Sequence, residues 1–478
     1  MAFLLVALPS LATADDAGII AVHDAETGAV VRAVTRAAPG DRAGLQTAYE
    51  RSRRLAARVQ RVAVSTEGCR RMRDGLLRLA RLGAAVPDGY DRLDPARARS
   101  ARAAFARQRS VVAALAPGCR IPSRRGARVS DEPVLIEPMS RAVTNGRIRV
   151  AMAPGADTAE LWVDGRHTVN LAHDGRVAVG VLSAGIGRHT VTVRFMNRGR
   201  HIATGTASGV QVTHTGGRRA TTVRTDAPAT AALRGAAGRF DGIGAAWISD
   251  LASGRRASWN ADARFPAAST VKLGVMIEAA RRSGAYPDRS AFTDDVVAIG
   301  GWSSNLAVNR LLPRIGGSAA VQRRLTTIGA SRSTFTGGYM VATDRVPRAG
   351  SPPASSRRVT TAADLGQIMI LLHDSARGEV AARRTTGLTS RQARFVLGTL
   401  YASERTGDNR GILDGLAANL PAAQKHGWIS SSRHTVALVD SAGGPVVVVA
   451  LTWSPGLTAQ RARVFGREVL RIAQVGGG

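Results

Sequence analysis

The stretch Ser269-Thr270-Val271-Lys272 places a serine three residues before a lysine, where an apolar helix is predicted to begin. Residues three apart share one face of a helix, so these two side chains are expected to meet. Lys272 is one of only two lysines among 66 basic residues, and the other is Lys425. Arginine keeps its proton in proteins, whereas a partly buried lysine can lose it. We therefore expect both positions to need an amine.

Two further motifs follow in the chain. They are Ser303-Ser304-Asn305 and Lys425-His426-Gly427. Ser-x-x-Lys, Ser-x-Asn and Lys-x-Gly in this order resemble the active-site set of the class A β-lactamases and penicillin-binding proteins. The run of residues 305–312 also resembles the helix that follows Ser-x-Asn in that superfamily. The resemblance covers residues 231–478 and implies a serine hydrolase that needs no cofactor and no metal.

The resemblance implies a role for each polar side chain of the three motifs. Ser269 is the expected nucleophile, and Lys272 is a candidate base for its proton. Ser303 is expected to pass a proton to the leaving nitrogen, with Lys425 holding it in place. Asn305 is expected to orient Lys272. Each motif alone has an ordinary alternative, such as a solvated lysine or a helix N-cap for Ser-x-Asn, and the three together carry the argument.

The Lys-x-Gly segment is expected to form the edge strand of the site. Gly427 lets a substrate backbone approach closely. The backbone N–H groups of Ser269 and Trp428 are expected to form the oxyanion hole. His426 and Arg433 are candidate partners of a substrate carboxylate, and a solvated surface arginine is the alternative for Arg433.

Three departures from the superfamily pattern bear on the reaction. Residues 331–361 contain no glutamate to activate a deacylating water, and their only acid is Asp344, whose side chain is one methylene shorter. His426 replaces a hydroxyl residue, so carboxylate binding is expected to strengthen as pH falls if the imidazole faces the site. Ser303 lies only 34 residues after Ser269. That short spacing predicts a more open groove, suited to a peptide.

These features favour an exported serine hydrolase that forms an acyl-enzyme with β-lactams or D-Ala-type cell-wall peptides and deacylates poorly. The alternative is a non-catalytic cell-envelope protein that binds or senses such ligands on the same fold. An esterase is a third reading. The related esterase branch typically has tyrosine where Ser303 stands, which argues against it.

The N-terminal residues indicate export. Residues 2–11 form an apolar core before Ala12-Thr13-Ala14, which is typical of a signal peptide with its cleavage site. The alternative is a buried N-terminal helix or strand. No later run has the apolar length of a membrane span, so the sequence predicts a secreted or envelope protein without a transmembrane anchor. Cys69 and Cys119 then predict a disulfide, and two buried thiols are the alternative.

Periodicity divides the chain into segments. Residues 1–14 are the predicted signal peptide, 15–128 a helical hairpin with the disulfide, 129–215 a small immunoglobulin-like β-sandwich, and 216–230 a linker. Residues 231–478 are predicted to form an α+β domain with an antiparallel sheet, in which strands from both ends share one sheet.

The net charge of +31 comes from arginine scattered along the whole chain. Aromatic residues make up 4%, and no cysteine or histidine spacing suits zinc. A nucleic-acid partner is therefore not expected, whereas a cationic surface favours anionic cell-envelope polymers. The protein is expected to be a monomer.

Overall fold

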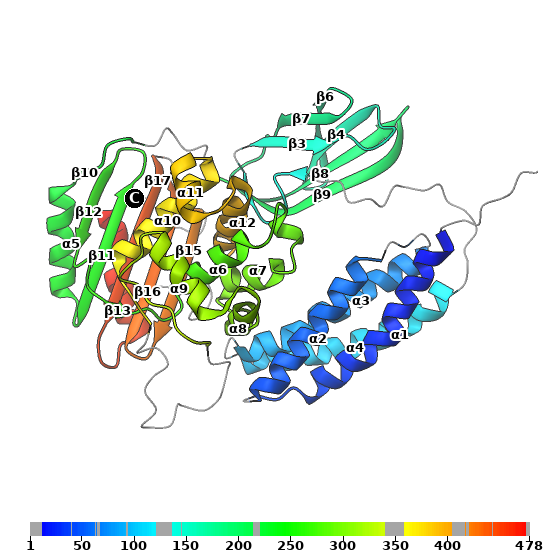
Figure 1. The fold of residues 1–478 in the computed structure, drawn as a ribbon, viewed down its shortest axis with the longest axis horizontal. Coiled ribbons are helices and arrows are strands. Elements are labelled where there is room, and N and C mark those ends of the chain that lie inside the picture. The colour runs from blue at the N-terminus through cyan, green and yellow to red at the C-terminus, as the bar shows by residue number, and fades with distance from the viewer. Residues whose placement is uncertain are drawn as a thin grey trace, which may run out of the picture. The chain divides into compact units, whose positions relative to one another are not determined.

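The structure is a computed structural model that describes residues 12–39, 41–62, 64, 67–91, 94–120, 136–144, 146–213, 220–339, 358–403, 416, 420–441 and 443–474. The chain forms two compact units, both traced in Figure 1. The first unit holds the N-terminal helices. The second holds everything described from residue 136 onward.

The N-terminal unit is helical, as predicted, but it has four described helices where the sequence predicted a hairpin of two. They are α1 (Ala12–Arg36), α2 (Arg42–Gln60), α3 (Glu67–Asp91) and α4 (Pro95–Arg120). Pro87 is a residue type that interrupts helices, yet α3 continues through it. Proline removes one helix hydrogen bond. Val86 and Tyr90 are buried beside it, and their packing outweighs that loss.

The predicted disulfide between Cys69 and Cys119 is present, and it joins α3 to α4. Closing a loop of this sequence separation, 50 residues, stabilises a fold by about 4 kcal/mol in the chain-entropy model. Residues 1–11 of the predicted signal peptide lie outside the described residues, and α1 begins at Ala12. Cleavage after Ala14 stays a prediction.

Residues 136–213 form two sheets that share one hydrophobic core. Ile148 and Val150 of one sheet pack with Val191, Val193 and Phe195 of the other. The strands of the first sheet are β1 (Ile136–Glu137), β3 (Arg147–Ala151), β7 (Val177–Val181) and β6 (Ala172–His173). Those of the second are β2 (Val143–Thr144), β9 (Arg200–Val212), β8 (Gly187–Asn197), β4 (Thr158–Val163) and β5 (Arg166–Asn170). An immunoglobulin-like topology stays a prediction.

A six-stranded sheet organises the C-terminal domain. In sheet order its strands are β10 (Arg224–Thr225), β12 (Arg255–Trp259), β11 (Ile243–Asp250), β17 (Gly444–Trp453), β16 (Ser432–Ser441) and β15 (Ala422–Ile429). Strand β11 pairs antiparallel with β17 over eight residues. The expectation that both ends of this domain share one sheet is therefore confirmed.

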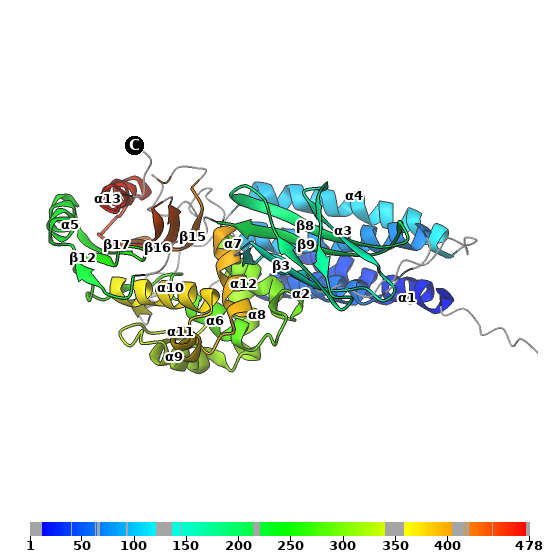
Figure 2. The ribbon, with the colours of Figure 1, turned by 90° about the horizontal axis from the view of Figure 1, so that it is seen from above.

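Helices cover both faces of this sheet, as Figure 2 shows for α13 on one side and α10 on the other. On one face lie α5 (Ala227–Arg239) and α13 (Ala459–Ile472). The other face packs against a second core built largely from helices, among them those that carry the first two motifs. These helices are α6 (Lys272–Arg281), α7 (Thr293–Trp302), α8 (Asn305–Arg314), α10 (Ala362–Arg377) and α12 (Ser390–Tyr401).

One boundary differs from the prediction. The linker expected over residues 216–230 ends earlier, because β10 and the start of α5 lie within it. Asp226 begins α5 by accepting a hydrogen bond from the backbone of Ala229, which is the ordinary N-cap arrangement. Residues 136–213 also pack against the C-terminal domain, because Met139 and Ala142 are buried in the same core as α12. Among the described helices, none combines the length and apolar character of a membrane span.

Candidate active site

Ser269 lies in the turn that leads into α6. It is half-buried, and the preceding residue, Ala268, has a φ of 48°. A left-handed backbone is sparsely populated for residues other than glycine, and such strain persists only where surrounding contacts enforce it. The turn is therefore held in an unusual shape one residue before the predicted nucleophile.

Lys272 begins α6 and is completely buried. Its Nζ donates to Asn305 Oδ1 at 2.6 Å and to the carbonyl oxygen of Ser303, and it lies 3.4 Å from Ser303 Oγ. Oxygen acceptors from a neighbouring segment thus fix the direction of the amine. The first two motifs are brought together as expected.

The Ser-x-Asn segment is a sharp bend between two helices. Ser303 ends α7 with a left-handed φ of 65°. The next residue, Ser304, is the N-cap of α8, and its side chain accepts from the backbone of Ala307 at 3.1 Å. The N-cap role is present in the structure, and the catalytic roles stay predictions. They belong to different residues, because Ser304 caps the helix while Ser303 and Asn305 face Lys272.

Lys425 approaches Ser303 from the sheet. Its Nζ donates to Ser303 Oγ at 2.6 Å and to the carbonyl oxygen of its neighbour His426 at 2.9 Å. Burial, and then the charge of Lys272, hold the pKa of Lys425 well below its usual value of 10.5. One hydroxyl therefore stands between two buried amines, an arrangement through which a proton can move in either direction.

The third motif lies on β15, the edge strand of the sheet. A Cβ on Gly427 would lie 2.6 Å from the backbone nitrogen of Ser269 and 3.0 Å from that of Thr270. Only glycine allows the strand to run this close to the nucleophile turn. Trp428 follows, 36% exposed, with the guanidinium of Arg433 5.6 Å from its ring centroid. Apart from His426, the predicted motif residues thus converge on one place.

The comparison with protein families agrees with this geometry. Residues 228–286 and 297–473 match the sequence profile described as the beta-lactamase enzyme family. This part of the chain belongs to that family.

Solved structures are similar to the same part of the chain. PBP-A is 18% identical, over 53% of this chain and 97% of that chain, with a TM-score of 0.44. A beta-lactamase from Sphaerobacter thermophilus is 18% identical, over 52% and 96%, with a TM-score of 0.40. One from Xanthomonas campestris pv. campestris is 20% identical, over 51% and 96%, with a TM-score of 0.40. No curated protein matches the chain.

His426 does not lie beside the other motif residues of this β-lactamase-family domain. Successive side chains of a strand alternate, so His426 projects from the face of β15 opposite Lys425 and Gly427. It is 2% exposed, and neither ring nitrogen has a hydrogen-bond partner among the described residues. Burial, and then the charges of Lys425 and Lys272, hold its pKa well below 6.5. The imidazole stays neutral, which argues against stronger carboxylate binding at low pH.

A second buried histidine, His434, links the sheet to the segment that leads into the Ser269 turn. His434 on β16 hydrogen-bonds through Nε2 to the carbonyl oxygen of Pro266 at 2.7 Å, and its Nδ1 accepts from the backbone of Thr452 at 3.3 Å. Pro266 precedes Ser269 by three residues. These two bonds require the neutral ring, with its proton on Nε2. Burial lowers the pKa of His434 to about 4, although its backbone hydrogen bonds act in the opposite direction.

This burial predicts that the β-lactamase-family domain loses stability in mild acid. Below pH 6.5 the unfolded chain binds a proton at His434, whereas the folded domain resists it down to about pH 4. Stability is thus fully present above pH 6.5 and falls by about 2 kcal/mol by pH 5. Urea unfolding at the two pH values, followed by tryptophan fluorescence, measures this loss. His434→Gln is expected to be less stable at pH 7 and less sensitive to pH, and an unchanged pH slope would contradict the assignment.

Sequence reasoning missed Tyr339, which the structure places at the site. Its hydroxyl donates to the carbonyl oxygen of Ala268 at 3.1 Å, and Lys272 Nζ lies 4.4 Å from its ring centroid. The signal available was indirect, since Asn309, which binds the Tyr339 backbone, belongs to the helix noted after Ser-x-Asn. Asp344, the only acid of the loop, lies outside the described residues.

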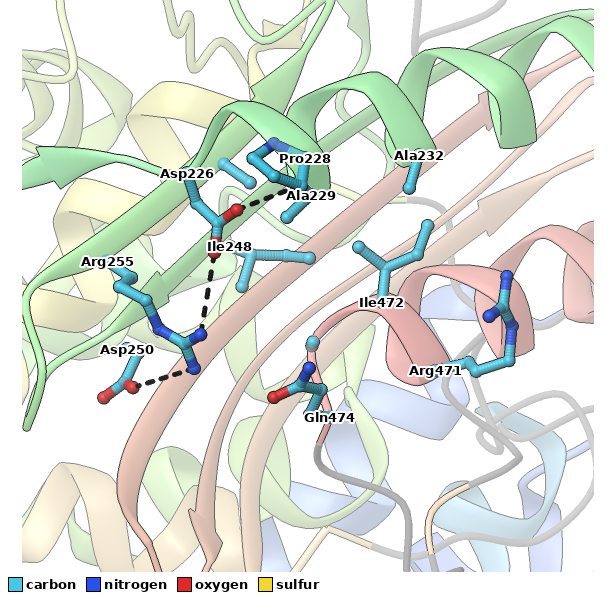
Figure 3. A pocket seen from close by; sticks show the side chains of 12 residues that line it. Asp226, Pro228, Ala229, Ala232, Ile248, Asp250, Arg255, Arg471, Ile472 and Gln474 are labelled. Carbon is cyan, nitrogen blue, oxygen red and sulfur yellow. Dashed lines mark hydrogen bonds and ion pairs between the residues drawn. The ribbon is translucent and has the colours of Figure 1, made fainter.

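A separate pocket of about 430 Å³ lies on the other face of the sheet, between α5 and the end of α13 (Figure 3). Arg255 lies 3.8 Å from Asp226 and 3.8 Å from Asp250 at its rim. Its wall includes Ile248, which packs in the core of that face rather than the core behind Lys272. Its lining has no serine or lysine, so it is distinct from the candidate active site.

Proposed function

We propose that this chain is an exported serine hydrolase that forms an acyl-enzyme on Ser269 with β-lactams or D-Ala-type cell-wall peptides. The hydrogen-bonded series Asn305–Lys272–Ser303–Lys425 beside the Ser269 turn is the observation that carries the proposal. Two buried amines around one hydroxyl have little structural use in a chain that otherwise uses arginine. They suit proton transfer, which an amine can perform and a guanidinium cannot.

Acylation follows from these positions. Ser269 Oγ attacks the substrate carbonyl carbon, and its proton passes to Lys272 in its neutral form. Backbone N–H groups of Ser269 and Trp428 stabilise the oxyanion of the tetrahedral intermediate. The carbon–nitrogen bond then breaks, and Ser303 gives its hydroxyl proton to the departing nitrogen. Ser303 recovers a proton from the Lys272 ammonium, so the step is balanced and leaves an ester on Ser269.

Slow deacylation is part of the proposal. The loop of residues 331–361 carries no glutamate. Its Tyr339 has a pKa raised by burial to about 12, so the phenol remains protonated and does not act as a general base at neutral pH. An ester that lacks a base to activate water persists, which is the behaviour of a penicillin-binding protein rather than an efficient β-lactamase.

Substrate recognition is proposed to rest on charge. The arginine-rich surface attracts anionic substrates and envelope polymers, and Lys425 with Arg433 provides positive charge where a substrate carboxylate is expected. The predicted signal peptide and the disulfide support an extracytoplasmic location for a monomer. The four-helix unit and the immunoglobulin-like module are proposed to hold the domain within the envelope.

Intact-protein mass spectrometry with benzylpenicillin tests the proposal. We expect one adduct, of the mass of the drug, that lasts for minutes to hours and is absent from Ser269→Ala. Ser318→Ala, in α9 (Gly317–Thr327), is the matched control and is expected to label normally. A covalent adduct on Ser269→Ala would refute the assignment of the nucleophile. Tight binding without any adduct would favour the non-catalytic binding or sensing protein.

A further inference from the structure

Tyr339 is fixed from its backbone by the helix that follows the Ser-x-Asn bend. Asn309 Nδ2 donates to the Tyr339 carbonyl oxygen at 2.6 Å, and the Tyr339 N–H donates to Asn309 Oδ1 at 2.7 Å. Asn309 lies four residues after Asn305, one turn along the same face of α8. A single helix thus holds both Tyr339 and the amide that binds Lys272.

The Tyr339 side chain contacts both parts of the Ser-x-x-Lys motif. Its hydroxyl donates to the carbonyl oxygen of Ala268, the left-handed residue immediately before Ser269. The face of its ring lies 4.4 Å from Lys272 Nζ. A neutral donor and an electron-rich ring face therefore meet the two groups that acylation requires to be correctly placed.

A second cation, Arg358, contacts the Tyr339 ring. The Arg358 guanidinium carbon lies 3.9 Å from the Tyr339 ring centroid, and Arg358 itself donates to the carbonyl oxygens of Thr336 and Gly338. Both Tyr339 and Arg358 are buried. The ring is thus fixed by its own backbone and by a neighbour, which is how a positioning group is kept rigid.

We propose that Tyr339 is the positioning residue of this site: its hydroxyl holds the Ser269 turn through Ala268, and its ring holds Lys272. The inference rests on the proposed acylation and assigns a function to a loop residue outside the three motifs. The charged groups around Lys272 are Lys425 on β15 and Arg358, which contacts the tyrosine ring. The neutral His426 projects from the opposite face of β15. The ring face opposes the effect of these cations by favouring the charged form of Lys272.

Two variants separate the roles of the hydroxyl and the ring. Tyr339→Phe removes only the bond to Ala268, so we expect acylation by benzylpenicillin to slow by about tenfold with an unchanged pH profile. Tyr339→Leu also removes the ring face, so acylation is expected to slow further. Its acidic limb is expected to move to lower pH, because the ring face that favours the charged form of Lys272 is gone. A purely structural role would slow the reaction without moving that limb.

Tyr286 supplies the matched control, because it is an exposed tyrosine with Arg391 over its ring at 5.0 Å. Tyr286→Phe and Tyr286→Leu are expected to behave like the unaltered protein. The inference is overturned if both Tyr339 variants acylate at the unaltered rate, or if the limb of Tyr339→Leu does not move.

A second reagent distinguishes failure of this inference from failure of the proposed function. If the unaltered protein ignores benzylpenicillin but a fluorophosphonate labels Ser269, the proposed substrate class is wrong. The same variants are then compared by their rates of fluorophosphonate labelling, with the same expected pH shift. If neither reagent labels Ser269, no activated nucleophile exists for Tyr339 to position, and both proposals fall.

Discussion

Lys272→Arg is expected to abolish measurable acylation, with a rate loss of about 10³-fold. The substitution follows the preference of a chain that has 66 basic residues and only two lysines. Lys272 is completely buried, and its Nζ is directed at Asn305 and Ser303. A guanidinium does not accept the proton of Ser269, because it is already protonated and stays so. The measurement is the rate of adduct formation on Ser269 with benzylpenicillin, by mass spectrometry.

Lys272→Met is the informative companion variant, because it keeps the length of the side chain but has neither charge nor a basic nitrogen. If Lys272 acts as a base, both variants are inactive to a similar degree. If it acts only as a positive charge, the arginine variant retains far more activity than the methionine variant. Thermal unfolding of both proteins shows whether the fold is kept. Near-normal acylation by folded Lys272→Arg would exclude the base role.

Gly427→Ala is expected to slow acylation by about 10²-fold. The added Cβ would lie 2.6 Å from the backbone nitrogen of Ser269 and 3.1 Å from the Cβ of Ala268. Real Cβ atoms do not approach backbone this closely, so β15 and the Ser269 turn must move apart. Loss of a single oxyanion-hole donor costs about 10² to 10³ in rate, and this shift misplaces the proposed donors at Ser269 and Trp428.

The matched control is Gly238→Ala in α5, on the other face of the sheet. A Cβ there meets no atom within 4 Å, and alanine is the better helix former. We expect it to acylate normally and to be as stable as the unaltered protein or slightly more so. Acylation of Gly427→Ala at the unaltered rate would show that the close approach of β15 is not needed for the reaction.

Much of the site could be predicted because its residues are unusual in this sequence. Lys272 and Lys425 stand out against arginine, and the structure joins both to Ser303. Tyr339 could not be predicted, because its role depends on a loop that folds back 71 residues after Ala268. The direction of the His426 side chain could not be predicted either. It depends on the register of the strand, which decides the face of the sheet from which each side chain projects.

The fold was predictable where local chemistry decides it. Gly155, Gly165 and Gly175 follow a proline or an aspartate, a pattern typical of turns, and all three have positive φ, which glycine adopts without strain. Local rules failed where packing decides. Proline is a helix breaker in isolation, yet α3 continues through Pro87 because the buried residues around it form a continuous face.

Strand β11 pairs with β17, and this pairing constrains when the C-terminal domain can fold during synthesis. Asp250 ends β11, and Gly444 begins β17, 194 residues later in the sequence. A ribosome adds roughly 5 to 20 residues per second, so β17 is synthesised on the order of 10 to 40 seconds after β11. The Ser269 turn is made during that interval, before β15, β16 and β17 exist. The geometry of this turn therefore depends on the finished chain. A nascent or C-terminally shortened polypeptide has the motif but lacks the strands that pack against it.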